Sequence, residues 1–184
     1  MTCGTMGNLC SMRSEFSRMY AMIRAALIAL CFAASAGAAS LECISWNVES
    51  GGADPAAISR QLTELPRADV YLLQEVSQQD IGRYAAAIRR AHGKNYKYYL
   101  SSVGGGDRLA MVVDEDRVQI RSFSELFSFG DHTLNDWRHR SPLVAHLRCR
   151  EDGTECLLVT VHLARGNAAL REDQAAGLRE WAAT

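Results

Sequence analysis

Three polar residues stand at the ends of short, mostly apolar segments. Asn47 ends Cys-Ile-Ser-Trp-Asn, Glu75 ends Tyr-Leu-Leu-Gln-Glu, and His162 ends Leu-Leu-Val-Thr-Val-His. Each segment is apolar enough to be a central strand. In layered sheets, ligands bind beyond strand ends, where residues from separate strands converge. We therefore expect the three side chains to share one site.

These residue types suit a divalent cation and a phosphate group. Carboxylate and amide oxygens are hard ligands for Mg²⁺ or Mn²⁺, which take one or two carboxylates together with waters and substrate phosphate. A nearby imidazole supplies a proton or a charge-assisted hydrogen bond to a phosphate oxygen. Each residue alone has a plainer interpretation, because a strand-end asparagine usually forms a turn and a lone histidine is usually structural. The three together favour a phosphoryl-transfer site.

The elements that must position these residues alternate along the chain. Asp54 followed by Pro55, with Ile58 and Leu62 spaced by four, predicts a helix that begins at this pair. The predicted helices span Asp54–Leu65, Asp80–Ala91 and Asn167–Ala183, and a loop is predicted over Phe127–His139. The predicted strands span Cys43–Asn47, Asp69–Glu75, Tyr96–Ser101, Arg108–Val113, Val118–Phe123, Pro142–Arg148 and Cys156–His162. Mixed strands and helices predict an α+β or α/β layered class.

Three of these segments resemble successive motifs of the endonuclease/exonuclease/phosphatase superfamily, which includes deoxyribonuclease I, abasic-site endonucleases, sphingomyelinases and inositol polyphosphate phosphatases. The segments are Ile44–Val48, Leu73–Val76 and Val159–Leu163, and the resemblance runs from about residue 41 to the end. It implies an α+β fold, a layered α/β sandwich of the deoxyribonuclease I-like type. It also implies that Asn47 and Glu75 bind the metal. By the same resemblance, His162 stabilises or protonates the phosphoryl group during in-line attack by water.

Two weaker matches resemble the deoxyribonuclease I branch. Arg140 opens a strand as a phosphate-contacting Arg-x-Pro does there, which implies a bidentate contact between Arg140 and a substrate phosphate. Asp107 precedes a strand where that branch has an acidic residue supporting the histidine, which implies that Asp107 orients His162. The plainer alternatives are a solvated loop cation at Arg140 and a hairpin cap at Asp107, after the glycine turn Gly104–Gly106.

Two later motifs of the superfamily, Gly-Asp-x-Asn and Ser-Asp-His, have no counterpart in the chain. Residues 40–184 are therefore expected to be a truncated domain, with the first sheet and its helices present and the second half absent. Because catalytic groups that act as a unit lose most of their effect when some are removed, we expect this chain alone to be inactive or nearly so.

The inner sheet face is expected to be exposed or poorly covered. It carries Ile44, Leu72, Val112 and Leu158. A truncated or frameshifted gene product explains this pattern, as does a fragment completed by another polypeptide that supplies the C-terminal half.

The first 39 residues are expected to be a leader. Ala25–Ala39 is an uncharged run that ends in small residues, including an A-x-A pattern at Ala36–Ala38. Such a run is shorter than the roughly 20 residues that cross a bilayer. This pattern is typical of a secretory signal peptide, with an uncleaved anchor or a buried helix as the alternative. Met19 or Met22 is an alternative start. The predicted location is secreted or periplasmic, with no stable membrane anchor.

Export places the chain in a compartment where disulfides are allowed. Cys149 and Cys156 flank a polar turn between two apolar segments, so a disulfide between them is one hypothesis, and two free thiols are the other. No Cys/His spacing indicates a zinc site.

A formal net charge of −1 excludes a very basic DNA-coating protein. The predicted function is an exported phosphoesterase, a nuclease or a phosphatase, that depends on Mg²⁺ or Mn²⁺ and acts on a phosphate ester, nucleic acid included. Arg140 and Asp107 favour a nuclease, whereas the acidic charge argues mildly against one. The alternative is a non-catalytic exported binding or structural module that retains the fold. A chance match of the three strand-end residues is the third interpretation.

Overall fold

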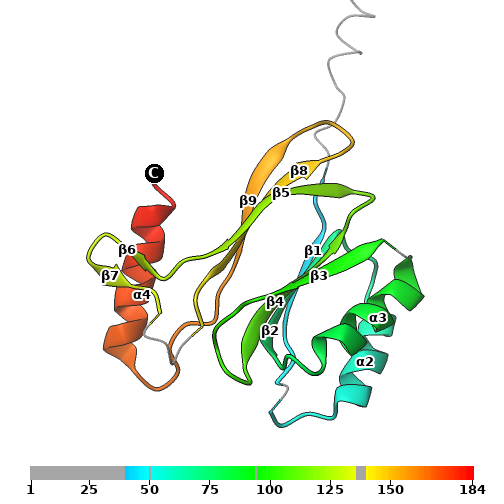
Figure 1. Cartoon of the computed structure of the whole chain (residues 1–184), viewed down its shortest axis with the longest axis horizontal. Helices are drawn as coiled ribbons and strands as arrows, with labels where there is room; N and C mark the ends of the chain where they lie inside the picture. The colour runs from blue at the N-terminus through cyan, green and yellow to red at the C-terminus, as the bar shows by residue number, and fades with distance from the viewer. Residues whose placement is uncertain (1–39, 50, 94, 136–139) are drawn as a thin grey trace, which may run out of the picture. The chain divides into compact units, whose positions relative to one another are not determined.

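We describe the chain from a computed structural model. It describes residues 40–49, 51–93, 95–135 and 140–184. The predicted leader lies outside the described residues, as does the end of the predicted loop, at 136–139. The described part belongs to one compact unit, Ala39–Thr184 (Figure 1). Within these ranges no helix is both long and apolar enough to cross a bilayer.

The first part of this unit is a mixed four-stranded sheet with two helices. Its elements are β1 (Cys43–Asn47), α2 (Pro55–Glu64), β2 (Val70–Val76), α3 (Ile81–His92), β3 (Tyr96–Leu100) and β4 (Arg108–Asp114). The strand order is β1-β2-β4-β3. Because α2 returns the chain to its starting edge, β1 and β2 are parallel, with Asn47 opposite Gln74. The ends of both strands therefore meet at one edge of the sheet.

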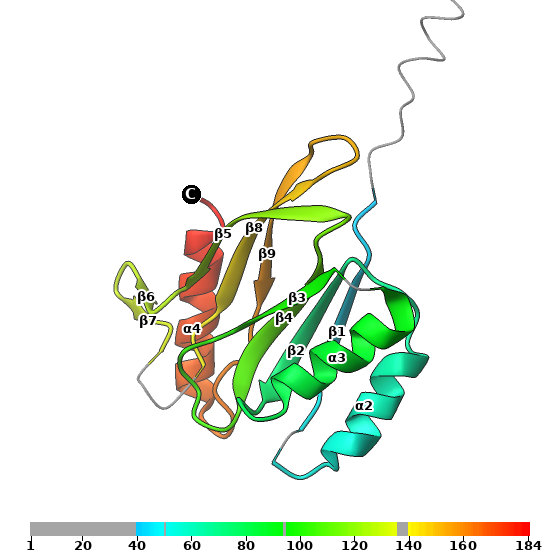
Figure 2. The ribbon, with the colours of Figure 1, turned by 45° about the vertical axis from the view of Figure 1, so that its right-hand side comes forward.

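Helices α2 and α3 lie side by side over one face of this sheet (Figure 2). The predicted start of the first helix is confirmed, since Pro55 is its first residue and Asp54 Oδ1 accepts a hydrogen bond from the Ala56 N–H at 2.9 Å. The second helix stops at Gly93, whose φ of +135° suits glycine. Large side chains of the sheet are fully buried against the two helices. They are Tyr71, Leu73 and Val112.

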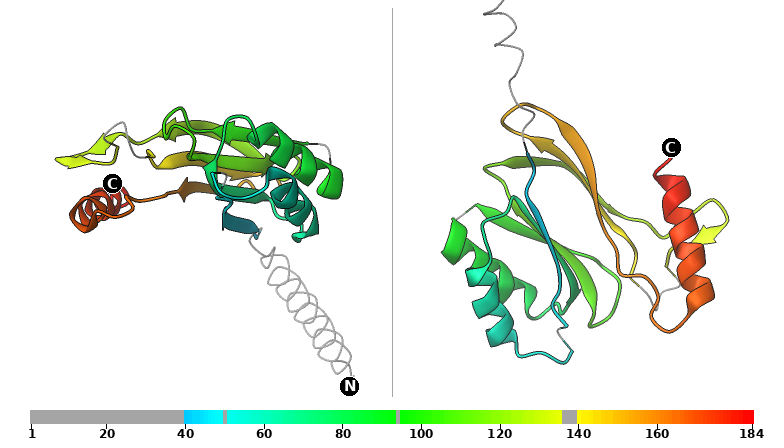
Figure 3. Two further views of the ribbon diagram at one scale, coloured as in Figure 1. Left: turned by 90° about the horizontal axis from the view of Figure 1, so that it is seen from below. Right: turned by 180° about the vertical axis from the view of Figure 1, so that it is seen from behind.

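A second, antiparallel sheet packs on the other face. Its strands are β5 (Val118–Glu125), β8 (Leu143–Cys149) and β9 (Glu155–Thr160), in the order β5-β8-β9. Met111 of β4 is buried between the sheets together with Leu143 and Leu147 of β8. The view from behind shows β9 running alongside the first sheet (Figure 3).

The α+β layered fold is confirmed, but the prediction of an uncovered inner face is wrong. Leu72 is only 8% exposed, because the second sheet covers it. Val112 and Ile44 point to the opposite face, where the helices cover them, and Leu158 is half-buried between the sheets. The strands assigned to a single sheet are divided between two sheets, and these bury each other's apolar faces.

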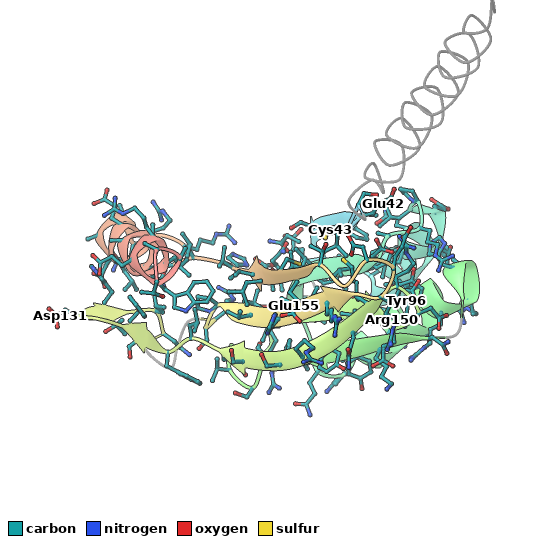
Figure 4. The ribbon with its side chains drawn as sticks, turned by 90° about the horizontal axis from the view of Figure 1, so that it is seen from above. Glu42, Cys43, Tyr96, Asp131, Arg150 and Glu155 are labelled. Carbon is teal, nitrogen blue, oxygen red and sulfur yellow. The ribbon has the colours of Figure 1, made fainter. Side chains whose placement is uncertain are left out.

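The last helix packs on a short hairpin within the segment predicted to be a loop. The hairpin strands are β6 (Ser128–Phe129) and β7 (His132–Thr133), and the helix is α4 (Ala168–Trp181). The His132 ring lies between two carboxylates of α4, with Nδ1 2.5 Å from Asp173 Oδ1 and Nε2 3.3 Å from Glu180 Oε1. Figure 4 shows Asp131 at the outer end of the hairpin. Part of the predicted loop is therefore a hairpin whose His132 ring contacts two carboxylates of α4.

The cysteines of the described part are free thiols, so the predicted disulfide does not form. Cys149 lies opposite Thr154 and Cys156 lies opposite Leu147, which makes the two cysteines diagonal neighbours. Diagonal positions are about 7–8 Å apart, beyond the usual Cα separation of a disulfide. The free-thiol alternative is confirmed.

Candidate active site

Asn47 and Glu75 lie on adjacent parallel strands at the same edge of the first sheet. Asn47 is the last residue of β1 and is paired with Gln74, the residue directly before Glu75. The exposed Asn47 side chain accepts a hydrogen bond from the Glu49 N–H at 3.0 Å through Oδ1. An amide oxygen has two lone pairs. One of them therefore remains for a cation.

The backbone of Glu75 departs from regular strand geometry. Its φ is +57°, and the pairing of β2 with β4 shifts register between Leu73 and Val76. A left-handed conformation at a non-glycine residue costs on the order of 1–3 kcal/mol and is often found at functional sites. A bulge of this kind re-aims a side chain. Here it accompanies a carboxylate that is only 14% exposed.

His162 meets Glu75 from the other sheet. It follows the end of β9 by two residues, and its Nε2 lies 3.5 Å from Glu75 Oε1. The Nδ1 atom is buried and has no hydrogen-bond partner within the described ranges. Burial, and then the positive charge of Arg140, lower the pKa of His162, whereas Glu75 and Asp107 oppose this shift. The neutral form of the imidazole is therefore favoured more than in a solvated histidine.

Gln74 joins the strands beneath this contact. Its Nε2 donates to Ser45 Oγ of β1 and to Thr160 Oγ1 of β9, both at 3.1 Å. Thr160 is buried and precedes His162 by two residues. Sequence reasoning missed this role, although an amide inside an apolar strand, directly before the candidate ligand, was a signal for it.

Arg140 and Asp107 form a second pair in the candidate site. Arg140 donates to Asp107 through two groups, Nε to the backbone oxygen and Nη2 to Oδ2, each at 2.8 Å. The arginine side chain is 13% exposed and the aspartate side chain 46%. Gly104 permits this approach, because its φ is +109° and a Cβ there would lie 3.1 Å from Arg140 Cγ.

The structure brings together some of the predicted residues and not others. Glu75 contacts His162, and Asp107 contacts Arg140. Among the described residues no hydrogen bond joins Asp107 to His162, so the orienting contact implied for Asp107 is replaced by a pair with Arg140. Asn47 is paired with Gln74, the residue before Glu75, and within the described ranges no hydrogen bond joins the Asn47 and Glu75 side chains.

The donor set at this edge fits a hard cation that keeps most of its waters. One carboxylate, Glu75, and one amide oxygen, Asn47, are the kind of ligands that Mg²⁺ takes when waters and a substrate phosphate complete its shell. In the part of the chain that the structure describes, no cluster of three or more His, Cys, Asp or Glu side chains could hold a metal by itself. The two side chains therefore suit a metal ion whose remaining ligands are waters and a substrate phosphate.

A family model described as the Endonuclease/Exonuclease/phosphatase family matches residues 44–180. None of the curated proteins compared with the chain matches it significantly.

Three solved structures are similar in fold. D. rerio TDP2 complexed with single strand DNA product has 21% identity and a TM-score of 0.56, with 77% of this chain and 52% of that chain covered. A Bacteroides thetaiotaomicron mannosyl-6-phosphatase has 17% identity and a TM-score of 0.61, with 78% and 59% covered. The human Nocturnin catalytic domain with bound sulfate has 15% identity and a TM-score of 0.59, with 77% and 58% covered. The chain thus spans somewhat more than half the length of these neighbours.

Proposed function

The chain belongs to the Endonuclease/Exonuclease/phosphatase family, and on that premise we propose that residues 40–184 carry part of the site of a metal-dependent phosphoesterase. The observation that carries the proposal is the contact between Glu75 and His162, 3.5 Å apart and contributed by different sheets. A structural histidine is usually hydrogen-bonded, whereas His162 is partly buried and its buried Nδ1 atom is unpaired within the described ranges. It faces a carboxylate held in a strained backbone conformation.

Asn47 and Glu75 are the residues that would hold Mg²⁺ or Mn²⁺. The bound metal would neutralise negative charge on the phosphate. Before a substrate binds, Glu75 is held against His162 and Asn47 against the Glu49 backbone. These contacts restrain both side chains at the edge of the sheet where the cation is proposed to bind.

His162 assists at the phosphoryl group. Its lowered pKa favours the neutral ring, in which one ring nitrogen carries a hydrogen and donates a hydrogen bond to a non-bridging phosphate oxygen. In the proposed in-line reaction, water attacks phosphorus and the P–O bond to the leaving group breaks. A positioned donor on the phosphoryl oxygen stabilises the charge that develops there.

Arg140 is proposed to hold a substrate phosphate. Two of its N–H groups bind Asp107, which fixes the guanidinium plane and leaves other N–H groups for an anion. Asp107 is then a positioning residue for Arg140 that also acts on His162 through its charge. The resemblance of Arg140 to a phosphate-contacting arginine of the deoxyribonuclease I branch favours a nuclease over a phosphomonoesterase.

The leader pattern of residues 1–39 supports export, so the proposed setting is outside the cytoplasm.

Neighbours with related folds act on different phosphate esters. One is described as a mannosyl-6-phosphatase and another as a 2′,3′-cyclic phosphatase. Hydrolysis of a phosphate ester is common to both descriptions and supports the proposed reaction class.

The test is hydrolysis of bis(p-nitrophenyl) phosphate with Mg²⁺ or Mn²⁺. It is run on this chain and on a form extended by any coding sequence found downstream. We expect no more than weak metal-dependent hydrolysis by this chain and faster hydrolysis by the extended form, because catalytic groups act as a unit. Glu75→Gln and His162→Ala should abolish both. Glu64→Gln, an exposed change at the end of α2, is the matched control and leaves the rate unchanged. Hydrolysis that survives Glu75→Gln overturns the metal assignment.

A further inference from the structure

A groove on the outer surface of the helix layer is lined by three arginines. It lies between α2 and α3, which run side by side in Figure 2, and has a volume of about 380 Å³. Arg60 comes from α2, whereas Arg83 and Arg90 come from α3. The remaining lining residues are Ala56, Ser59 and Thr63. This groove lies on the face of the sheet opposite the second sheet and is separate from the candidate active site.

The three groove arginines are not paired with acidic side chains of the described part of the chain, and Glu64 of α2, four residues after Arg60, does not line the groove. Within the described ranges no hydrogen bond or ion pair engages the three guanidinium groups, and no Asp or Glu lines the groove. Helix α3 contains no acidic residue. By contrast, Arg67 and Arg117 are paired with carboxylates. Three unpaired guanidinium groups that converge on one hollow make a site for an anion.

The spacing of the arginines indicates an extended anion. Arg83 and Arg90 are seven residues apart on α3, so they share a face and are separated by roughly 10 Å along the helix axis. Arg60 approaches the same groove from α2. The hydroxyls of Ser59 and Thr63 already donate to backbone carbonyls, so the guanidinium groups supply the donors. Charges repeated over this distance are a property of a phosphodiester chain rather than of a single phosphate.

We propose that this groove binds the sugar–phosphate backbone of a nucleic-acid strand. No aromatic side chain lines it, so bases are not stacked and binding is independent of sequence. Both helices begin at the edge of the sheet that carries Asn47 and Glu75, since α2 follows β1 and α3 follows β2. A strand held here therefore leads toward that edge. The identification of the ligand as a nucleic acid rests on the proposed function. The unpaired positive charge of the groove is observed independently of that function.

The test is fluorescence anisotropy with a labelled 20-mer of oligothymidylate and the whole chain, over a range of salt concentrations. Arg83→Gln combined with Arg90→Gln is compared with Arg121→Gln combined with Arg179→Gln. The second pair removes the same charge from exposed arginines outside the groove. We expect the groove variant to bind at least about tenfold more weakly at low salt. Its log–log salt slope should be shallower by about 1.4, at about 0.7 per lost phosphate contact.

The control pair is expected to change affinity less than threefold. Equal weakening by both pairs, or a wild-type chain that does not bind oligothymidylate, overturns the proposal. A third measurement uses vesicles of phosphatidylcholine with phosphatidylserine. If the chain binds these vesicles through the groove arginines and does not bind DNA, the nucleic-acid proposal is overturned and the groove binds a membrane surface instead.

Hydrolysis by the same variants separates this inference from the proposed function. Glu75→Gln is expected to retain oligothymidylate binding while it loses hydrolysis. Hydrolysis together with DNA binding that ignores the groove arginines refutes the groove and leaves the phosphoesterase. DNA binding that depends on the groove arginines, without any hydrolysis even in the extended form, supports the groove and refutes the proposed phosphoesterase.

Discussion

Replacing Gln74 with leucine removes the donor that links three strands below the candidate site. Ser45 is exposed and water replaces the lost bond there, but Thr160 is 2% exposed and its hydroxyl loses its partner. A buried polar group left unpaired costs about 1–3 kcal/mol. We therefore expect Gln74→Leu to lower the free energy of unfolding by about 2 kcal/mol. For a unit of this size that corresponds to a melting temperature lower by about 4–8 °C.

Urea unfolding followed by circular dichroism measures this effect. Gln61→Leu, at an exposed position of α2, is the matched control and is expected to change stability by less than about 0.5 kcal/mol. Adding Thr160→Val to Gln74→Leu removes both partners of the buried bond, so the double variant should recover most of the loss. A Gln74→Leu midpoint equal to that of the control, or a double variant less stable than Gln74→Leu, would refute the reasoning.

Two further predictions concern the contact between α4 and the β6–β7 hairpin. Gly177→Ala places a Cβ 2.7 Å from His132 Cβ and should destabilise the protein by about 1–3 kcal/mol in thermal melting, whereas Gly82→Ala, with nothing within 4 Å, should be neutral or stabilising. Asp173 and then Glu180 raise the pKa of His132 above its ordinary 6.5. The stability contributed by protonated His132 with these two carboxylates is therefore fully present below pH 6.5, and it is lost as the pH rises through the raised pKa. The difference in melting temperature between wild type and His132→Gln should therefore shrink as pH rises, and a difference that grows with pH would contradict this sign.

The elements that hold the candidate site could be predicted because local signals determine them. The Asp54-Pro55 pair starts α2, and this helix in turn makes β1 and β2 parallel, so their ends meet at one edge. From that arrangement the closeness of Asn47 and Glu75 follows. The approach of His162 could be expected only by assuming that its strand lies near the same edge.

The remaining features depend on contacts between segments distant in sequence. Gln74 and Thr160 are 86 residues apart, and their bond exists only because the second sheet stacks on the first. The same stacking buries Leu72, which sequence reasoning expected to be exposed. The pairing of Asp107 with Arg140 depends on the positive φ of Gly104, which the amino-acid type permits but does not dictate. Sequence reasoning missed these three features because they depend on contacts formed only in the folded protein.

The most direct test of the proposed site is a Mn²⁺ titration of the isotopically labelled chain, followed by NMR. The predicted result is selective paramagnetic broadening of the signals of Asn47, Glu75 and the His162 ring. It is abolished by Glu75→Gln and retained in Glu64→Gln. Broadening that is centred elsewhere, or that Glu75→Gln leaves unchanged, would contradict a metal site at the ends of β1 and β2.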